Sequence, residues 1–304
     1  DKHTFNNLKK VLKKTEEKSF VYLIGADNLL NFHTWYKWEK IFQLIPIAIF
    51  DRPKYKNSSL SSKSSKKFRQ FTYPENDDFE DRPLIFFLFG GSFVGGSKSS
   101  SDIVALCTKY AKRGYVAVSI NYRLGLNILS TYSGERAVYR GVQDASALIR
   151  YLREYHEELN INPNKIFIWG SSAGSFIGLH LAYSDEGERP ESTYGGGSDP
   201  DLGCIDCEGN NYNHNSKPNA LVSCWGAIGD LDWIDADNQV PTMLFHGTLD
   251  PIVPFESGYP FTIDIALPIV YGSNPIHEKL NELNILNELF KFEILLKKQK
   301  KFLT

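Results

Sequence analysis

Long apolar runs are missing from this sequence, so membrane-spanning helices are not expected. The longest candidate, residues 41–50, is well short of the about 18–20 apolar residues that a span needs, and Pro46 interrupts it. The first residues contain no apolar signal region, so the chain as written is expected in the cytoplasm. A formal net charge of -2 gives no indication of a nucleic-acid partner.

Cysteine is also scarce, with four residues in 304. Cys204 and Cys207 have C-x-x-C spacing, but no second pair and no nearby pair of histidines completes a zinc site. The pair lies in a segment rich in Gly, Asp and Asn, whereas a redox motif would open a helix. We therefore expect a local disulfide or two free thiols, and no metal or organic cofactor.

Apolar and aromatic residues, by contrast, are plentiful. Hydrophobic residues make up 42% of the chain and aromatic residues 13%, which suffices for one large domain or two smaller ones. Residues 54–67 are rich in Ser and Lys and have no hydrophobic period, which predicts a flexible linker. The predicted organisation is a small unit at 1–53, this linker, and a large domain at 68–304.

The small unit has the pattern of a βαβ element. A basic amphipathic helix is expected at 5–18, followed by strands at 20–25 and 46–51 with a helix at 29–45 between them. The wording of 22–29, of Phe32-His33 and of 51–53 (DRP) resembles the nicotinate-nucleotide adenylyltransferase family. That family's G-x-F-x-P-x-H-x-G-H and I-S-S-T-x-I-R segments do not occur here, so the unit is expected to be non-catalytic.

In the large domain, short apolar segments alternate with helical ones. This alternation predicts an α/β fold with a doubly wound, mainly parallel sheet. In such a sheet, ligands bind at the carboxyl ends of the strands. Strands are expected at 84–89, 115–120, 165–169, 220–225 and 241–246, and helices at 102–113, 135–159 and 274–283.

The central motif of the domain is G-x-S-x-G at residues 170–174 (GSSAG), directly between a predicted strand and an apolar helical segment. Strand, tight turn and helix together predict a nucleophile elbow with Ser172 as the nucleophile. The backbone N–H of Ala173 would then donate to an oxyanion at the helix N-terminus. The alternative is a plain Gly/Ser turn.

Two further segments have the residue types that a serine nucleophile needs around it. A glycine-rich turn follows the predicted strand at 84–89, and Asp250 follows the strand at 241–246 in the wording H-G-T-L-D. Together with the elbow, residues 71–285 resemble the carboxylesterase/lipase group of the α/β-hydrolase superfamily. The resemblance implies that Asp250 is the catalytic acid and that Gly91, Ser92 and Ala173 form the oxyanion hole. Where the group usually has H-G-G-G-F, this chain has Phe89 for the His and Ser92 for the last Gly.

The base of the predicted triad is expected to be a histidine that follows Asp250 in the sequence. His277 alone follows Asp250 within these residues, and it lies in a predicted helix. In the resembling group the catalytic His usually comes later, after another strand, where this chain has FKFEILLKKQKKFLT at 290–304. Either His277 serves as the base, which is our prediction, or it is a helix-surface residue and the triad is incomplete.

These observations predict a serine carboxylesterase that forms an acyl-enzyme and cleaves small-molecule esters. Short acyl chains are favoured because no long apolar lid helix is evident, and the loop at 184–217 is expected to roof the pocket. A peptidase or other acyl hydrolase on the same fold is the nearest alternative. The second alternative is a hydrolase-fold binding protein that is catalytically impaired. Because two unrelated resemblances meet in one chain, we interpret the sequence as chimeric.

Overall fold

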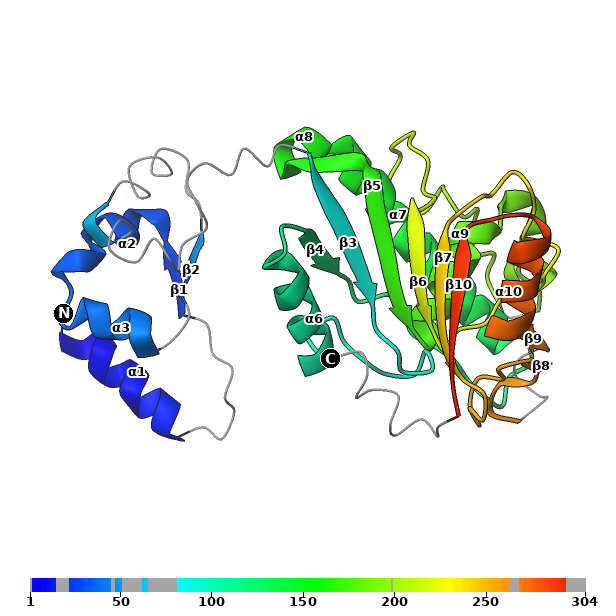
Figure 1. The fold of residues 1–304 in the computed structure, drawn as a ribbon, viewed down its shortest axis with the longest axis horizontal. Coiled ribbons are helices and arrows are strands. Elements are labelled where there is room, and N and C mark those ends of the chain that lie inside the picture. Colours follow the sequence, from blue (N-terminus) through cyan, green and yellow to red (C-terminus); the bar gives the residue numbers. More distant parts are fainter. Residues whose placement is uncertain are drawn as a thin grey trace. The chain divides into compact units, whose positions relative to one another are not determined.

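The fold is described from a computed structural model of the chain (Figure 1). It divides into two compact units, Asp1–Asp78 and Phe79–Thr304. The predicted linker at 54–67 lies outside the described residues except for 62–64, where the Ser64 hydroxyl donates a 2.8 Å hydrogen bond to the Leu29 carbonyl. The described residues are 2–14, 22–44, 47–50, 62–64, 81–197, 199–262 and 268–293.

The first unit contains the expected βαβ-like arrangement, because its two strands pair in parallel with helices between them. Phe5, Leu29, Phe32 and Ile41 form its buried core. The helix expected at 29–45 is instead interrupted, since Lys37 has a φ of 53° that a continuous right-handed helix excludes. The elements are α1 (Lys2–Lys14), β1 (Tyr22–Gly25), α2 (Ala26–Asn31), η1 (Phe32–Thr34), α3 (Trp38–Leu44) and β2 (Ile47–Phe50).

The second unit is built on a six-stranded sheet in the order β10-β7-β6-β5-β3-β4. Every pair of neighbouring strands is parallel, which confirms the predicted doubly wound, mainly parallel α/β architecture. Its strands are β3 (Arg82–Leu88), β4 (Val116–Ser119), β5 (Ile161–Ser171), β6 (Ala220–Cys224), β7 (Thr242–Gly247) and β10 (Asn287–Phe292).

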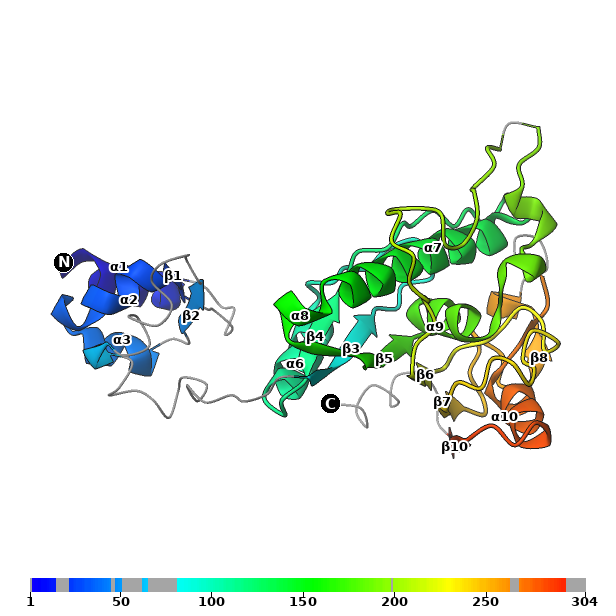
Figure 2. The same cartoon turned by 90° about the horizontal axis from the view of Figure 1, so that it is seen from above.

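Helices cover both faces of this sheet. Figure 2 shows α7 and α9 on one side and α10 on the other. The single helix expected at 135–159 divides at Tyr155, where φ is -99° and ψ is 25°. The helices are α6 (Ser101–Ala111), α7 (Ser133–Glu154), α8 (His156–Leu159), α9 (Ala173–Tyr183) and α10 (Ser273–Glu282), and a small hairpin pairs β8 (Ser257–Gly258) with β9 (Val270–Tyr271). Short 3-10 turns are η3 (Glu186–Glu188), η4 (Glu191–Thr193) and η5 (Pro260–Thr262).

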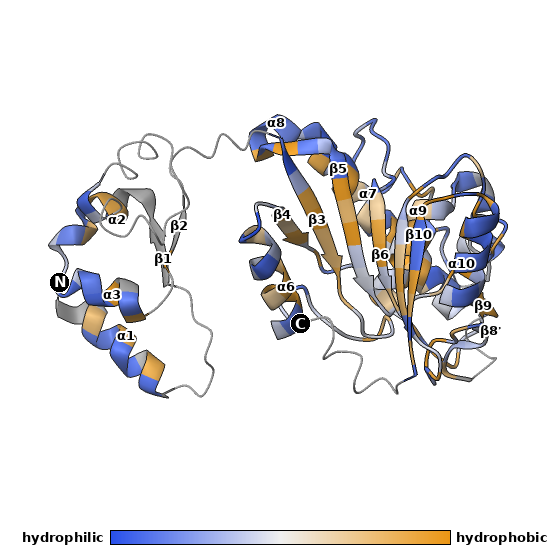
Figure 3. Ribbon diagram, viewed as in Figure 1, coloured by the Kyte–Doolittle hydropathy of each residue, from blue (hydrophilic) through white to orange (hydrophobic). Residues whose placement is uncertain are grey.

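The core lies along the central strands and around α9, as the hydropathy colouring of Figure 3 indicates. Helix α9 is apolar on all sides because it is enclosed between the sheet and α7, and Ile177, Leu179 and Leu181 are buried. Burying each such side chain stabilises the fold by about 1.5–3 kcal/mol. The N-terminus of α9 is therefore held firmly against the sheet. None of the described helices combines the length and apolarity that crossing a membrane demands.

Candidate active site

Ser172 occupies the sharp turn between β5 and α9. Its φ of 49° and ψ of -120° are strained for a residue with a side chain, and such strain is retained where the surroundings enforce it. Its backbone N–H donates a 2.9 Å hydrogen bond to the Cys224 carbonyl at the end of β6. Glycine is required at 174, since a Cβ there would overlap the Leu88 carbonyl of β3. This backbone has the geometry of a nucleophile elbow.

The glycine-rich turn after β3 lies directly beside this elbow. Strands β3 and β5 are neighbours, with Leu88 opposite Gly170, so the segments that follow them meet at one edge of the sheet. A Cβ on Gly90 would lie only 3.1 Å from the Ser172 Cβ. Ser92 has a φ of 55°, a left-handed conformation in which it takes the position of the family's last glycine.

Phe89 replaces the histidine of the usual H-G-G-G-F wording, and it is packed into the core. Its ring stacks on Tyr122 with centroids 4.3 Å apart, and the Tyr122 hydroxyl donates a 2.8 Å hydrogen bond to the Phe89 carbonyl. Burial raises the pKa of Tyr122, which keeps its hydroxyl protonated as a donor. The stacked rings and this hydrogen bond thus hold the glycine-rich turn in place at the position where the family usually has a histidine.

A small cavity of about 30 Å³ opens at the elbow. Ser92, Ser172 and Ala173 all line it, so the structure brings together the predicted nucleophile and two of the predicted oxyanion donors. Gly91 is the preceding residue of the same turn, with a φ of 144°. The remaining wall is apolar and consists of Phe93, Leu126, Val138, Phe176, Ile252, Val253, Pro260 and Phe261.

Asp250 lies in the loop that follows β7. Two residues of the same loop, Ile252 and Val253, line this cavity. The Asp250 Oδ1 accepts hydrogen bonds from the backbone N–H groups of those two residues, at 2.9 and 3.1 Å. The side chain is fully buried, and its Oδ2 has no hydrogen-bond partner among the described residues. A buried carboxylate oxygen without a donor costs free energy, so this oxygen is suited to receive an N–H group.

His246 supports the Asp250 loop from behind. Its Nε2 donates to the Val253 carbonyl at 3.1 Å, so its Nδ1 accepts the 2.8 Å hydrogen bond from the Ser273 hydroxyl. Nε2 lies 3.9 Å from Asp250 Oδ2, too far for a hydrogen bond. Burial lowers the pKa of His246, and the nearby Asp250 carboxylate opposes that shift. With both ring nitrogens engaged, His246 positions the loop.

His277 lies away from the elbow, and this corrects our prediction that it is the base. On α10, its Nδ1 hydrogen-bonds with Asn287 Oδ1, and its Nε2 accepts from Asn281 at 3.2 Å. Asn287 pairs with Thr242 at the amino end of β7, whereas Asp250 follows its carboxyl end. Those ends are about 16 Å apart at a rise of 3.3 Å per residue. The reason is topological, because α10 precedes β10 and delivers His277 to the wrong edge of the sheet.

Replacing His277 by alanine is therefore expected to leave ester hydrolysis unchanged. The substitution removes two hydrogen bonds within the α10–β10 connection and should lower the free energy of unfolding by about 1–2 kcal/mol. Urea unfolding measures that loss, and initial rates with p-nitrophenyl butyrate measure the activity. A large fall in rate with unchanged stability would restore His277 as the base.

A second, larger cavity of about 540 Å³ was not predicted from the sequence. It shares Val138 and Phe176 with the elbow cavity, and His180 and Trp233 line it further along. Phe176 and His180 are four residues apart on α9, a spacing that places them on one helix face. That spacing, directly after the elbow, is the signal by which this wall could have been found.

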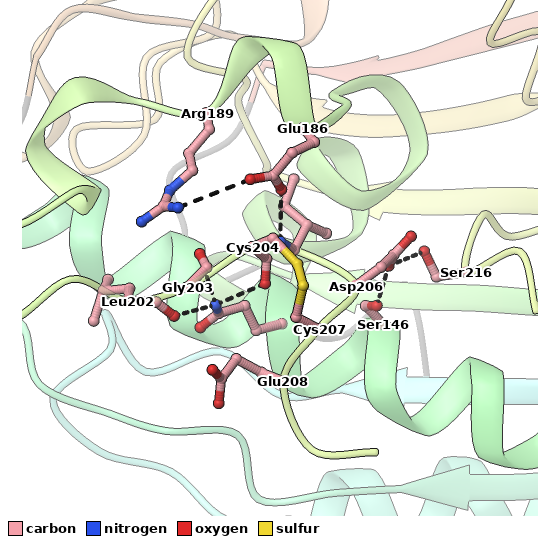
Figure 4. The surroundings of a disulfide bond; sticks show 12 residues. Ser146, Glu186, Arg189, Leu202, Gly203, Cys204, Asp206, Cys207, Glu208 and Ser216 are labelled. Atoms are coloured by element: carbon pink, nitrogen blue, oxygen red, sulfur yellow. Dashed lines mark hydrogen bonds and ion pairs between the residues drawn. A yellow bond between two sulfur atoms is a disulfide. The ribbon is translucent and has the colours of Figure 1, made fainter. Parts of the chain in front are cut away.

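The loop at 184–217 contributes Glu188–Ser192 and Ile205 to the larger cavity. Side chains of α7 hold the loop, since Arg136 donates to the carbonyls of Ser192 and Pro200. Figure 4 shows the Cys204–Cys207 disulfide, with a Cα–Cα distance of 5.2 Å, and the contact of Ser146 with Asp206 beside it. One of the two predicted cysteine states, the local disulfide, is therefore present. No cluster of three metal-ligating side chains occurs in the described part of the chain.

The parallel sheet and the elbow at the carboxyl end of its central strand define an α/β-hydrolase. More specifically, residues 70–231 match the BD-FAE family, and because this match covers more than half of the 304 residues, the chain belongs to that family. The second unit is accordingly an esterase-like hydrolase domain. This confirms the hydrolase resemblance and the predicted fold.

Solved structures of esterase 2 from Thermogutta terrifontis share the fold. The native form is 24% identical, with a TM-score of 0.50, and covers 73% of this chain and 75% of its own. The apo form is 21% identical, with a TM-score of 0.50, and the match covers 76% of this chain and 84% of the esterase chain.

Curated relatives of a second family, the nicotinate-nucleotide adenylyltransferases, confirm the other resemblance seen in the sequence. A probable nicotinate-nucleotide adenylyltransferase of Agrobacterium fabrum is 43% identical over 75 residues, which are 25% of this chain and 40% of that protein. The corresponding protein of Rhizobium meliloti is 37% identical over 113 residues, 37% and 57% of the two chains. The chain thus spans less than two thirds of the length of these relatives. Two distinct homology regions therefore meet in one chain, consistent with the interpretation as chimeric.

Proposed function

We propose that this chain is a serine carboxylesterase that cleaves short-chain carboxylic esters through an acyl-enzyme at Ser172. The observation that carries the proposal is the strained, positive-φ backbone of Ser172, φ 49° and ψ -120°, at a cavity that Ser92 and Ala173 also line. A turn of this kind lifts the hydroxyl clear of the sheet. The cavity volume of about 30 Å³ favours a short acyl group.

In this mechanism the Ser172 oxygen attacks the ester carbonyl carbon, and the alcohol leaves as the acyl-enzyme forms. The backbone N–H groups of Gly91, Ser92 and Ala173 stabilise the negative charge on the carbonyl oxygen. The Ser172 proton would pass to a base whose N–H binds Asp250 Oδ2, and the base would give this proton to the leaving alkoxide, which departs as the alcohol. Water then attacks the acyl group, releases the carboxylic acid and restores the serine.

The proton acceptor sets the expected rate. The rings of the five described histidines in this unit all have hydrogen-bond partners other than Asp250. His156 bonds to Arg153, His180 to Phe176, His214 to Glu154, His246 to Val253 and His277 to Asn287. Without an imidazole in place, turnover rests on the oxyanion donors and on substrate binding, which retain roughly 10³–10⁴-fold catalysis over water in dissected triads. We therefore expect slow acylation and still slower deacylation. The same observation favours a second candidate, a hydrolase-fold protein that binds esters without turning them over.

The first unit is proposed to take no part in this chemistry. Its resemblance covers residues 1–53, and its relatives' phosphate-handling segments do not occur in the 304 residues of the chain. Nucleotidyl transfer would need backbone and basic groups to hold the nucleotide phosphates. The proposed domain boundaries remain 1–53 for this unit, 54–67 for the linker and 68–304 for the esterase domain.

Acyl transfer to Ser172 tests the proposal directly. Because deacylation lacks a positioned base, incubation with p-nitrophenyl butyrate should leave a butyryl group on the peptide that contains the elbow. Peptide fragmentation in the mass spectrometer assigns the group to Ser172 rather than to its neighbour Ser171. The Ser172→Ala variant should carry no label, and Ser171→Ala should carry it undiminished. A label that persists in Ser172→Ala would exclude the proposed nucleophile, and no label in either chain would favour the binding protein.

A further inference from the structure

The larger cavity is placed to receive the part of a substrate that lies beyond the reacting carbonyl. Helices α7 and α9, the loop after α9 and the segment Gly229–Trp233 enclose its volume of about 540 Å³. Val138 and Phe176 belong to both its wall and that of the elbow cavity. The two cavities are therefore neighbours, and an ester that extends from Ser172 past these two side chains would enter the larger space.

Its ionisable wall is predominantly acidic. The lining carboxylates are Glu135, Glu188, Glu191 and Asp230. Glu135 and Glu188 are half-buried in the wall, while Glu191 and Asp230 lie at the exposed rim. Desolvation strengthens the interaction of a half-buried carboxylate with a cation, since fewer water molecules screen the charge.

Arg189 is the one lysine or arginine among the described residues that line this cavity, and its charge is already paired. Its guanidinium binds Asp201 and lies 3.8 Å from a Glu186 oxygen, and it covers the Tyr194 ring at 3.9 Å. His180 adds no positive charge at neutral pH, because burial lowers its pKa to about 4. The carboxylates of the wall are therefore not balanced from within it.

Aromatic rings line the same cavity. Trp233 meets the His180 ring edge to face with centroids 5.3 Å apart, and Phe176 stacks on His180 with centroids 6.3 Å apart. Rings and carboxylates together bind organic cations, by cation–π attraction and by charge. A bare metal ion would prefer a cluster of oxygen ligands, and the described residues contain no such cluster of three.

We propose that this cavity binds the alcohol portion of a cationic ester, one whose alcohol carries a quaternary ammonium or protonated amine. The inference rests on the proposed function, with the short acyl group in the elbow cavity and the alcohol extending across Val138 and Phe176. The size difference between the two cavities, about 30 against 540 Å³, matches a small acyl group in the one and a larger alcohol in the other. Esters with a short acyl chain and a bulky cationic alcohol are the substrate class.

Binding to the Ser172→Ala chain tests this inference separately from turnover. Butyrylcholine and its uncharged isostere, 3,3-dimethylbutyl butyrate, have the same shape and differ only in the quaternary nitrogen. Calorimetric titration should give an affinity for butyrylcholine on the order of 10-fold higher, as expected for a partly desolvated cation–π and charge interaction. Raising the salt concentration should reduce the difference, because exposed charges are screened.

Substitutions in the wall locate the effect. The combined Glu135→Gln and Glu191→Gln variant removes two lining carboxylates and should lose most of the preference for butyrylcholine. Glu157→Gln on α8 makes the same change in charge at a residue outside the cavity and should retain the preference. Equal affinities for the two esters, or an equal loss in Glu157→Gln, would overturn the inference. Selective binding of butyrylcholine with no acylation of the wild-type chain would sustain the cavity assignment and reject only the proposed esterase activity.

Discussion

Imidazole added to the wild-type chain should raise its hydrolysis of p-nitrophenyl butyrate on the order of 10- to 100-fold. Asp250 Oδ2 is buried without a partner among the described residues, and His246 and His277 bond elsewhere. A positioned general base contributes roughly 10²–10⁴-fold. A base that must diffuse in from solution recovers only part of this rate enhancement, because binding and orienting it costs entropy that a base fixed in the fold does not lose. The rescued rate should increase with pH as imidazole loses its proton, since only the neutral form accepts one.

The control for this experiment is Ser172→Ala, because imidazole itself attacks activated esters. The rate in that variant should equal the rate with imidazole and no protein. Asp250→Ala should retain Ser172 chemistry but respond less to imidazole, because the carboxylate that would orient the ring is gone. Identical imidazole dependence in the wild type and Ser172→Ala would mean that Ser172 is not the nucleophile whose proton imidazole removes. No stimulation at all would show that the elbow does not admit the base.

The elbow could be predicted because its determinants are local. The strand, the five residues 170–174 and the apolar helix follow one another without a break, so the backbone geometry of Ser172 depends on neighbours in sequence. The adjacent turn at Gly90 could also be placed, because parallel strands present their carboxyl ends at one edge. The fold class followed from the same alternation of strands and helices.

The position of His277 could not be predicted in this way. It depends on the register of β10 against β7, in which Asn287 lies opposite Thr242, and that is a contact between distant segments. The residues 287–292 (NELFKF) do not alternate strictly between polar and apolar side chains, so no two-residue period marks them as a strand.

The complete wall of the larger cavity could not be assembled from the sequence, although the loop at 184–217 was expected to roof a pocket and the spacing of Phe176 and His180 indicates one part of the wall. Its wall joins Val138 of α7 to Phe176 of α9 and to Trp233, segments that the sheet topology brings together. The loop itself is fixed by buried arginines on α7, such as Arg150, which donates to the Glu208 carbonyl at 2.8 Å. Helical periodicity identifies a buried face, but not the partner that each of its side chains meets.

Replacing Gly174 by alanine should destabilise the fold by about 3 kcal/mol, at the upper end of the cost of overpacking a core. A Cβ at this position would overlap the Leu88 carbonyl and lie 2.7 Å from that of Phe89. Both are backbone atoms of the strand and turn beside the elbow, so neither can move aside without shifting α9 from β3. The displaced helix would carry Ala173 and Ser172 with it, and acylation should fall together with stability.

Gly187→Ala is the matched control, because it makes the same chemical change where no atom lies within 4 Å of the added Cβ. Its free energy of unfolding should stay within about 0.5 kcal/mol of the wild-type value, the range of an ordinary surface substitution. Urea unfolding of both variants, with acylation measured below the transition, separates the two effects. If Gly174→Ala unfolds with the wild-type midpoint and still acylates, then α9 and β3 do not approach as closely as the elbow requires, and the site built upon that approach must be revised.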